Sequence, residues 1–158
     1  MSQLTNHLLS LSTSTPYDAA IKHEFLSSAG NGTLGNDRLA FWLAQDRIYA
    51  AHAYPRFIGA LIANIPYNSL HPIQSTEELL NQRILKTLVF CLENVVREVA
   101  FFSETGQTWG LDLHVWKERR ETRDYTAEMA RITAGTGIED GLVFLWAMEK
   151  VWFFVLSF

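Results

Sequence analysis

The chain has 158 residues, of which 48% are hydrophobic and 19% are charged, and its formal net charge is −4. This length suits one domain, and this composition is sufficient to build an apolar core. Apart from Lys117, Arg119 and Arg120, the basic residues are scattered. Because binding to nucleic acid needs a concentrated basic face, we expect no nucleic-acid partner.

The number of cysteines and the hydropathy of the sequence indicate the cellular location of the protein. Cys91 is the single cysteine, which excludes an internal disulfide and favours a reducing, cytoplasmic location. No apolar run reaches the roughly 18 residues that a membrane-spanning helix needs, and we see no secretory signal. We therefore expect no membrane partner. Residues 1–15, rich in Ser and Thr, are expected to be a flexible leader before a domain over 16–158.

Helix signals divide the rest of the chain. Pro16 suits a first helical turn with Thr15 as its cap, and the glycine turn at 30–32 ends that helix. Pro55 should bend the second helix, and Ser75 with Glu78 resembles a capping box that starts the third. The helices are predicted at about 17–28, 36–65, 76–105, 121–135 and 139–158. Apolar positions in the third helix recur at spacings of three and four, and no strand alternation is visible, so the fold class is all-α.

An acid stands in an aromatic stretch of the second predicted helix. Asp46 and Tyr49 are three residues apart, so they share one helix face, and Trp42 lies on the same stripe. A carboxylate there could bind a polar nitrogen heterocycle through hydrogen bonds. The alternative is an exposed acid, or an ion pair with Arg47 or Arg56.

A second acid, Glu149, lies in the apolar run 145–150. Burial would raise its pKa by desolvation, and such carboxyls serve as general acids and bases. The alternative is a surface glutamate that pairs with Lys150 or Arg123.

Several of these segments together resemble the TenA family, the thiaminase II group of the haem-oxygenase-like fold. The resemblance covers about 16–151. It rests on the segments Lys22-His23-Glu24-Phe25, Gly32-Thr33-Leu34, Phe41-x-x-x-Gln45-Asp46-x-x-Tyr49, Glu121 to Thr126 and Leu145 to Val151. The last of these resembles the subgroup that carries a glutamate instead of a nucleophilic cysteine.

The resemblance implies a haem-oxygenase-like helical bundle and a hydrolase that salvages thiamin pyrimidine from aminopyrimidine or formylaminopyrimidine compounds. It implies that Asp46 anchors a small-molecule pyrimidine, that Trp42, Tyr49 and Tyr125 line its pocket, and that Glu149 moves protons. It implies no cofactor, and assembly into a homo-oligomer is an open alternative. No residue spacing suggests a metal site.

The chain departs from this family pattern after Val151, where the last helices of the family are absent and an aromatic segment ends the sequence. From the resemblance we expect a partial domain that lacks the last helices, with weak stability and little or no activity. The alternatives are a non-catalytic pyrimidine binder or interaction module of the same fold, and haem or quinone chemistry. Glu98 could line the cavity or pair with Arg97 or Arg83, whereas Cys91 is expected to be a buried, inert thiol.

Overall fold

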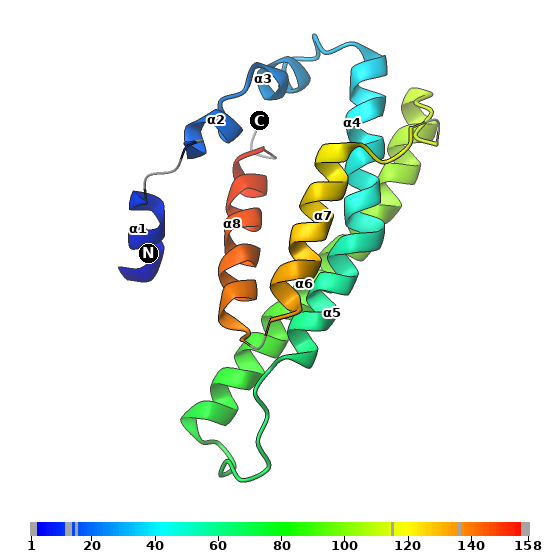
Figure 1. Cartoon of the computed structure of the whole chain (residues 1–158). Helices are drawn as coiled ribbons and strands as arrows, with labels where there is room; N and C mark the ends of the chain where they lie inside the picture. Colours follow the sequence, from blue (N-terminus) through cyan, green and yellow to red (C-terminus); the bar gives the residue numbers. More distant parts are fainter. Residues whose placement is uncertain (1–2, 12–13, 15, 115, 136, 156–158) are drawn as a thin grey trace. The chain divides into compact units, whose positions relative to one another are not determined.

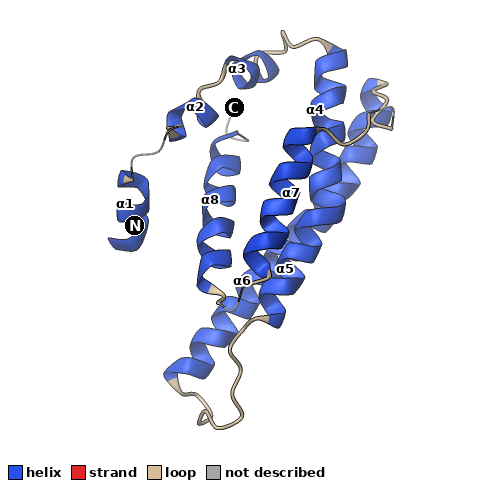
Figure 2. Cartoon of the chain, in the orientation of Figure 1, coloured by secondary structure: helices blue, strands red, loops and turns tan. Residues whose placement is uncertain are grey.

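The computed structural model describes residues 3–11, 14, 16–114, 116–135 and 137–155, with the backbone alone for 152–155. Within these residues all regular structure is helical, which confirms the all-α prediction (Figure 2). The chain divides into two compact units: unit 1 comprises Met1–Leu34 and Ala147–Phe158, and unit 2 comprises Gly35–Trp146. None of the helices in the described part is both long and apolar enough to cross a membrane.

Unit 1 contains short helices near the N-terminus and the end of the last helix. Their bounds are α1 (Gln3–Ser10), α2 (Tyr17–Ile21), α3 (Glu24–Gly30) and α8 (Glu139–Val155), of which the part from Ala147 belongs to unit 1. The hydroxyl of Tyr17 donates a hydrogen bond of 3.1 Å to the carbonyl oxygen of Lys150, which ties α2 to the end of α8.

One expectation for this unit stays open and another needs correction. Residues 1–15 were expected to be a flexible leader; helix α1 lies within them, and the flexibility of this segment stays a prediction. One helix was predicted over 17–28, but the structure breaks it between α2 and α3. The break arises because Nδ1 of His23 accepts a hydrogen bond of 3.1 Å from the N–H of Phe25 and caps α3. The predicted cap Thr15 lies outside the described residues.

Unit 2 is a set of helices that run alongside one another, and it holds most of the buried core. Its elements are α4 (Asn36–Ile48), the π-helix η1 (Tyr49–Ala53), α5 (Tyr54–Ala63), α6 (Thr76–Trp109), α7 (Arg120–Thr133) and the first turns of α8. In Figure 1, α4 continues through η1 into α5, and α6 and α7 lie beside this continuous rod.

The junction of α4 and α5 follows from Pro55. Proline has no N–H, and its ring would collide with the carbonyl four residues earlier, so an ordinary α-helix cannot pass through it unchanged. The structure accommodates this with the wider π-helix η1, and Pro55 stands in the first turn of α5. The predicted interruption at Pro55 is therefore present as a π segment. Such segments are frequent at functional sites.

The start of α6 is the predicted capping box. The Oγ of Ser75 accepts a hydrogen bond of 3.2 Å from the N–H of Glu78, and the carboxylate of Glu78 accepts one from the N–H of Gln74. The helix does not end at Gly106, as the sequence suggested, but at Gly110, whose φ of 61° favours glycine. A Cβ on Gly106 would lie 3.3 Å from the carbonyl oxygen of Leu111, so this glycine lets the following segment pack against the helix.

The core of unit 2 is formed by side chains that water barely reaches. The largest of them are Ile58, Leu61, Leu88, Phe102 and Met129. The first turns of α8 pack closely on α5, because a Cβ added to Gly141 would lie 2.2 Å from Cδ2 of Leu61. Packing in this core fixes the positions of α4, η1, α6 and α7 against one another. It therefore also positions the polar residues described next.

Candidate functional site

The most unusual polar group in unit 2 is Asp46, in the last turn of α4. Its side chain is buried, with 8% of it exposed, so the alternative of an exposed acid does not hold. Burial raises the pKa of this carboxyl from 3.8 to about 8, and the negative charge of Glu98 adds to the shift. At neutral pH the group is therefore mostly a neutral acid, which can both donate and accept a hydrogen bond.

Glu98 is contributed by α6 and is half-buried. The sequence left open whether Glu98 lines a cavity or pairs with an arginine, and the structure brings its charge to bear on Asp46. Two carboxyl groups whose charges act on each other repel when both are ionised. A cation placed near them would relieve this repulsion and favour ionisation of the pair.

Unit 2 also holds a series of aromatic rings in mutual contact. The ring of Tyr49, in η1, is 5.7 Å from that of Tyr54 and 5.5 Å from that of Tyr125, in α7. The ring of Tyr125 is in turn 6.0 Å from that of Phe144, in the first turns of α8. Tyr49 is buried, whereas Tyr125 is 37% exposed, so the rings extend from the core to the surface. Faces of tyrosine rings attract cations.

Gln45 is the neighbour of Asp46 and makes a very different set of contacts. Its Nε2 donates to the carbonyl oxygen of Lys117 at 3.0 Å. Its Oε1 accepts from the N–H of Arg119 and from the hydroxyl of Thr122, each at 2.8 Å. These bonds fasten the segment before α7 to α4. The sequence analysis missed this role, although a glutamine on a mostly apolar helix stretch signals a buried amide that needs partners.

The remaining predicted site residues lie in different places. Trp42 is half-buried in α4, one turn before Asp46. Glu149 belongs to unit 1, where its side chain is exposed rather than buried in an apolar environment. Cys91 is buried, as expected for a small apolar side chain. The structure thus brings Tyr49 and Tyr125 together in the unit that holds Asp46, and a catalytic role for Glu149 stays a prediction.

Comparison with known proteins gives one distant match. The chain is 29% identical over 157 residues to a probable transcription factor of Fusarium pseudograminearum (strain CS3096). This match covers 98% of the chain, and the chain spans 30% of the length of that relative. No model of a known protein family matches the chain, and no solved structure matches it.

These findings correct the resemblance to the TenA family. Neither a family model nor a solved structure supports membership, and the relative that matches carries a different name. The short segments that suggested the resemblance include the Gln-Asp pair at 45–46, whose glutamine has a structural role here. Short helical motifs of this kind recur because an amphipathic helix with inward polar groups is a general solution to packing.

Proposed function

We propose that unit 2 is a ligand-binding module that takes up a small, positively charged nitrogen base beside Asp46, without chemical conversion. The observation that carries this proposal is the placement of a buried acid next to a second carboxyl group, with tyrosine rings in the same unit. Buried carboxyl groups with strongly raised pKa values are candidates for functional sites.

The chemistry of the ligand follows from the charge of the pair. A protonated amine or amino-heterocycle brings the positive charge that lets Asp46 ionise beside Glu98. A carboxyl group can also face a ring nitrogen and its adjacent amino group with two parallel hydrogen bonds. Because Asp46 is 8% exposed, neighbouring side chains must move to admit the ligand.

The hydrolysis that the resemblance implied is left out of this proposal. It rested on the family assignment, which the comparisons overturn, and its proposed acid–base group Glu149 is exposed in unit 1. Turnover of an aminopyrimidine, like the cytoplasmic location, therefore stays a prediction that no observation here tests.

Calorimetry with 4-amino-5-aminomethyl-2-methylpyrimidine as the probe tests this proposal. At pH 6.5 the acid is protonated, so uptake of a cation should release close to one proton per ligand, which titrations in buffers of different ionisation enthalpy detect. Asp46→Asn should abolish this release and weaken binding about tenfold or more, a change of roughly 1.4 kcal/mol.

Asp37→Asn is the matched control, because Asp37 is an exposed acid on the same helix. This variant should bind the probe as the unaltered chain does. A chain that fails to bind the probe, or whose proton release survives Asp46→Asn, would remove the basis of the proposal. Measurement of ammonia in the same samples distinguishes binding from turnover.

A second candidate function draws on the distant relative. The chain matches a stretch of a probable transcription factor, and its own net charge of −4 disfavours direct contact with DNA phosphates. We infer that a region of this kind would sense a ligand within a regulator rather than contact DNA. Fluorescence anisotropy with a labelled duplex at physiological salt should show no binding, and micromolar affinity would reverse this inference.

A further inference from the structure

A groove of about 500 Å³ lies in unit 2 between two helical walls. One wall is formed by the end of α4, by η1 and by α5, and the other by α7 and the residue Glu118 before it. None of the five residues predicted from the sequence as a site lines this groove. Its volume falls within the range of roughly 300–1,000 Å³ that is typical of small-molecule sites.

The floor of the groove is apolar and built from small side chains. Alanines from both walls leave room above Phe57 and Met129, which are almost completely buried. The second wall supplies Ala127 and Ala130 of α7 and Ala134 at its C-cap, a spacing of three and four that keeps them on one face. A hydrocarbon chain of several carbons could therefore pack against this floor.

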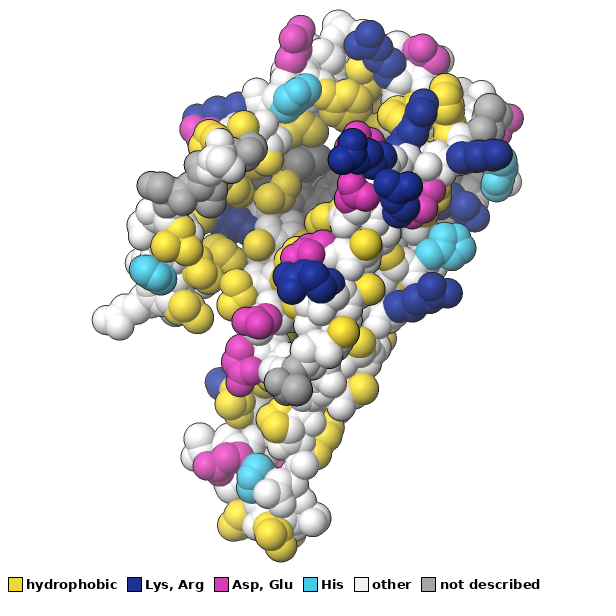
Figure 3. All heavy atoms as spheres, viewed as in Figure 1, with side chains coloured by type: hydrophobic (Ala, Val, Ile, Leu, Met, Phe, Trp, Pro, Cys, Tyr) yellow, Lys and Arg dark blue, Asp and Glu magenta, His cyan; other side chains and the backbone are white. Residues whose placement is uncertain are grey.

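The rim of the groove carries more positive than negative charge. Arg56 comes from α5 and Arg123 from α7, so a guanidinium stands on each wall, and Glu118 supplies one carboxylate. The net charge of these side chains is positive by one, with the imidazole of His52 neutral. On the face that Figure 3 shows, Lys and Arg side chains also gather over the upper part of unit 2, where α7 begins.

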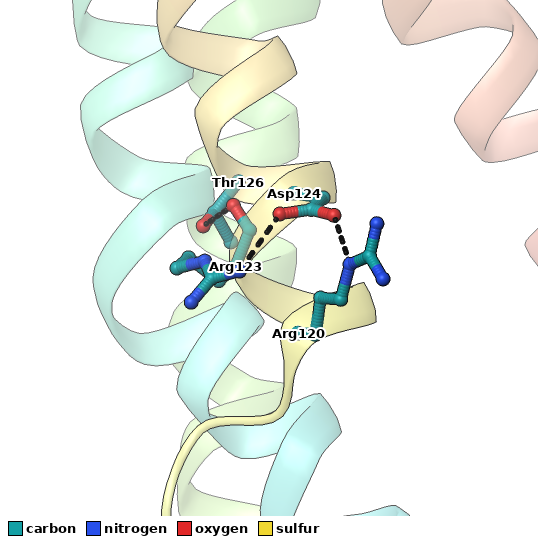
Figure 4. Close-up of polar contacts among 4 residues, drawn as sticks. All are labelled: Arg120, Arg123, Asp124 and Thr126. Carbon is teal, nitrogen blue, oxygen red and sulfur yellow. Dashed lines mark hydrogen bonds and ion pairs between the residues drawn. The ribbon is translucent and has the colours of Figure 1, made fainter.

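Among the residues that the structure describes, the guanidinium of Arg123 contacts Asp124 at the surface. Its Nη2 lies 3.3 Å from Oδ1 of Asp124, whose other oxygen lies 3.4 Å from Nε of Arg120 (Figure 4). All these side chains are more than half exposed, and exposed ion pairs contribute little. Asp124 also has Arg120 as an alternative partner, so Arg123 can turn toward an anion at the rim.

We propose that this groove binds an organic monoanion, a carboxylate attached to a short apolar chain. The carboxylate would lie between Arg56 and Arg123, since guanidinium groups recognise carboxylates through paired hydrogen bonds. The hydrocarbon chain of the ligand would pack against the alanines of the floor. A monoanion fits better than a dianion because Glu118 stands at the same rim and would repel additional negative charge.

Titration of the ¹⁵N-labelled chain with octanoate, followed by amide chemical shifts, tests this proposal. We expect saturable shifts for amides of η1, α5 and α7, and binding of octanol and of octyl phosphate at least about fivefold weaker, a difference of roughly 1 kcal/mol. The double variant Arg56→Gln with Arg123→Gln should weaken octanoate binding about tenfold or more. Ala130→Trp should block the groove and abolish the saturable shifts.

Arg131→Gln is the matched control, since Arg131 is an exposed arginine of α7 outside the groove, paired with Glu128. It should bind octanoate as the unaltered chain does. Circular dichroism verifies that each variant keeps its helices. Three results would overturn the proposal. The double variant could bind octanoate as tightly as the unaltered chain, the unaltered chain could bind octyl phosphate more tightly than octanoate, or octanoate could cause no saturable shifts. Because Asp46 takes no part in this groove, Asp46→Asn should leave octanoate binding unchanged, which separates this test from that of the proposed function.

Discussion

Gln45 and Asp46 are consecutive buried polar residues on α4, yet their surroundings are opposite in kind. The Gln45 side-chain amide makes three hydrogen bonds, two to the segment before α7 and one to Thr122 in α7. Asp46 faces the charge of a second carboxyl group, and its pKa rises to about 8. A satisfied buried amide specifies the fold, whereas an acid kept beside another acid costs stability and calls for a functional reason.

The largest expected effect is the pH dependence that Asp46 confers on stability. The native state keeps a proton that the unfolded chain releases above pH 3.8. Through this group, the free energy of unfolding is therefore highest below about pH 4 and falls as pH rises to about 8, by at most about 1.4 kcal/mol per pH unit. Asp46→Asn should remove this decline and stabilise the protein at pH 8. Urea denaturation of both proteins between pH 5 and 8 measures it, and parallel pH profiles would contradict the assignment.

Gln45→Leu should destabilise the protein, whereas Asp46→Asn should stabilise it at pH 8. It leaves the N–H of Arg119 and the carbonyl of Lys117 without their partner, so we expect a loss of about 2–4 kcal/mol at all pH values. Urea denaturation measures this loss, with Gln82→Leu as the control because Gln82 is an exposed glutamine of α6. If Gln45→Leu were no more destabilising than its control, the amide would not be a structural anchor.

Thr122→Val removes one of the bonds to Gln45 and keeps the shape of the side chain. The expected loss is about 1 kcal/mol, because the amide oxygen retains the N–H of Arg119. Thermal unfolding compares this variant with Thr87→Val, whose exposed hydroxyl bonds only to its own helix. Losses of equal size in the two variants would show that the bond to Gln45 contributes nothing specific.

The smallest effect is expected for Glu98→Gln. Burial is the larger cause of the raised pKa of Asp46 and Glu98 the smaller one, so this variant should lower that pKa without restoring its ordinary value. The decline in stability with pH should then end at a lower pH than in the unaltered chain. A return of the pKa to about 4 would make Glu98, and not burial, the dominant cause.

Local signals in the sequence predicted most of the helices. Ser75 with Glu78 marked the start of α6, and the glycine turn after α3 marked a boundary, because these residues act on their immediate neighbours. The break at His23 and the extension of α6 to Gly110 were missed, since a cap by histidine and the packing of Leu111 against Gly106 are not visible in local propensities.

The candidate site was predictable in part. The residues around Asp46 left open whether this acid is exposed, ion-paired or turned inward, and the inward direction was expected only from the family resemblance. Glu98 was already an alternative for the cavity. The bonds of Gln45 to residues more than 70 positions away, and the groove between α5 and α7, depend on which helices become neighbours. The resemblance of short segments to a known family could not supply these contacts, because patterns on the scale of one helix do not specify its packing partner.

The central claim is that Asp46 is a buried acid kept neutral until a cationic base arrives. Titration of the ¹³C-labelled carboxyl groups by NMR, with Asp46→Asn to assign the resonance, tests it most directly. This account predicts a pKa of about 8 for Asp46 in the free protein, and a clear decrease when the aminomethylpyrimidine is present in saturating amounts. A pKa near 4, or one that the aminomethylpyrimidine leaves unchanged, would contradict it.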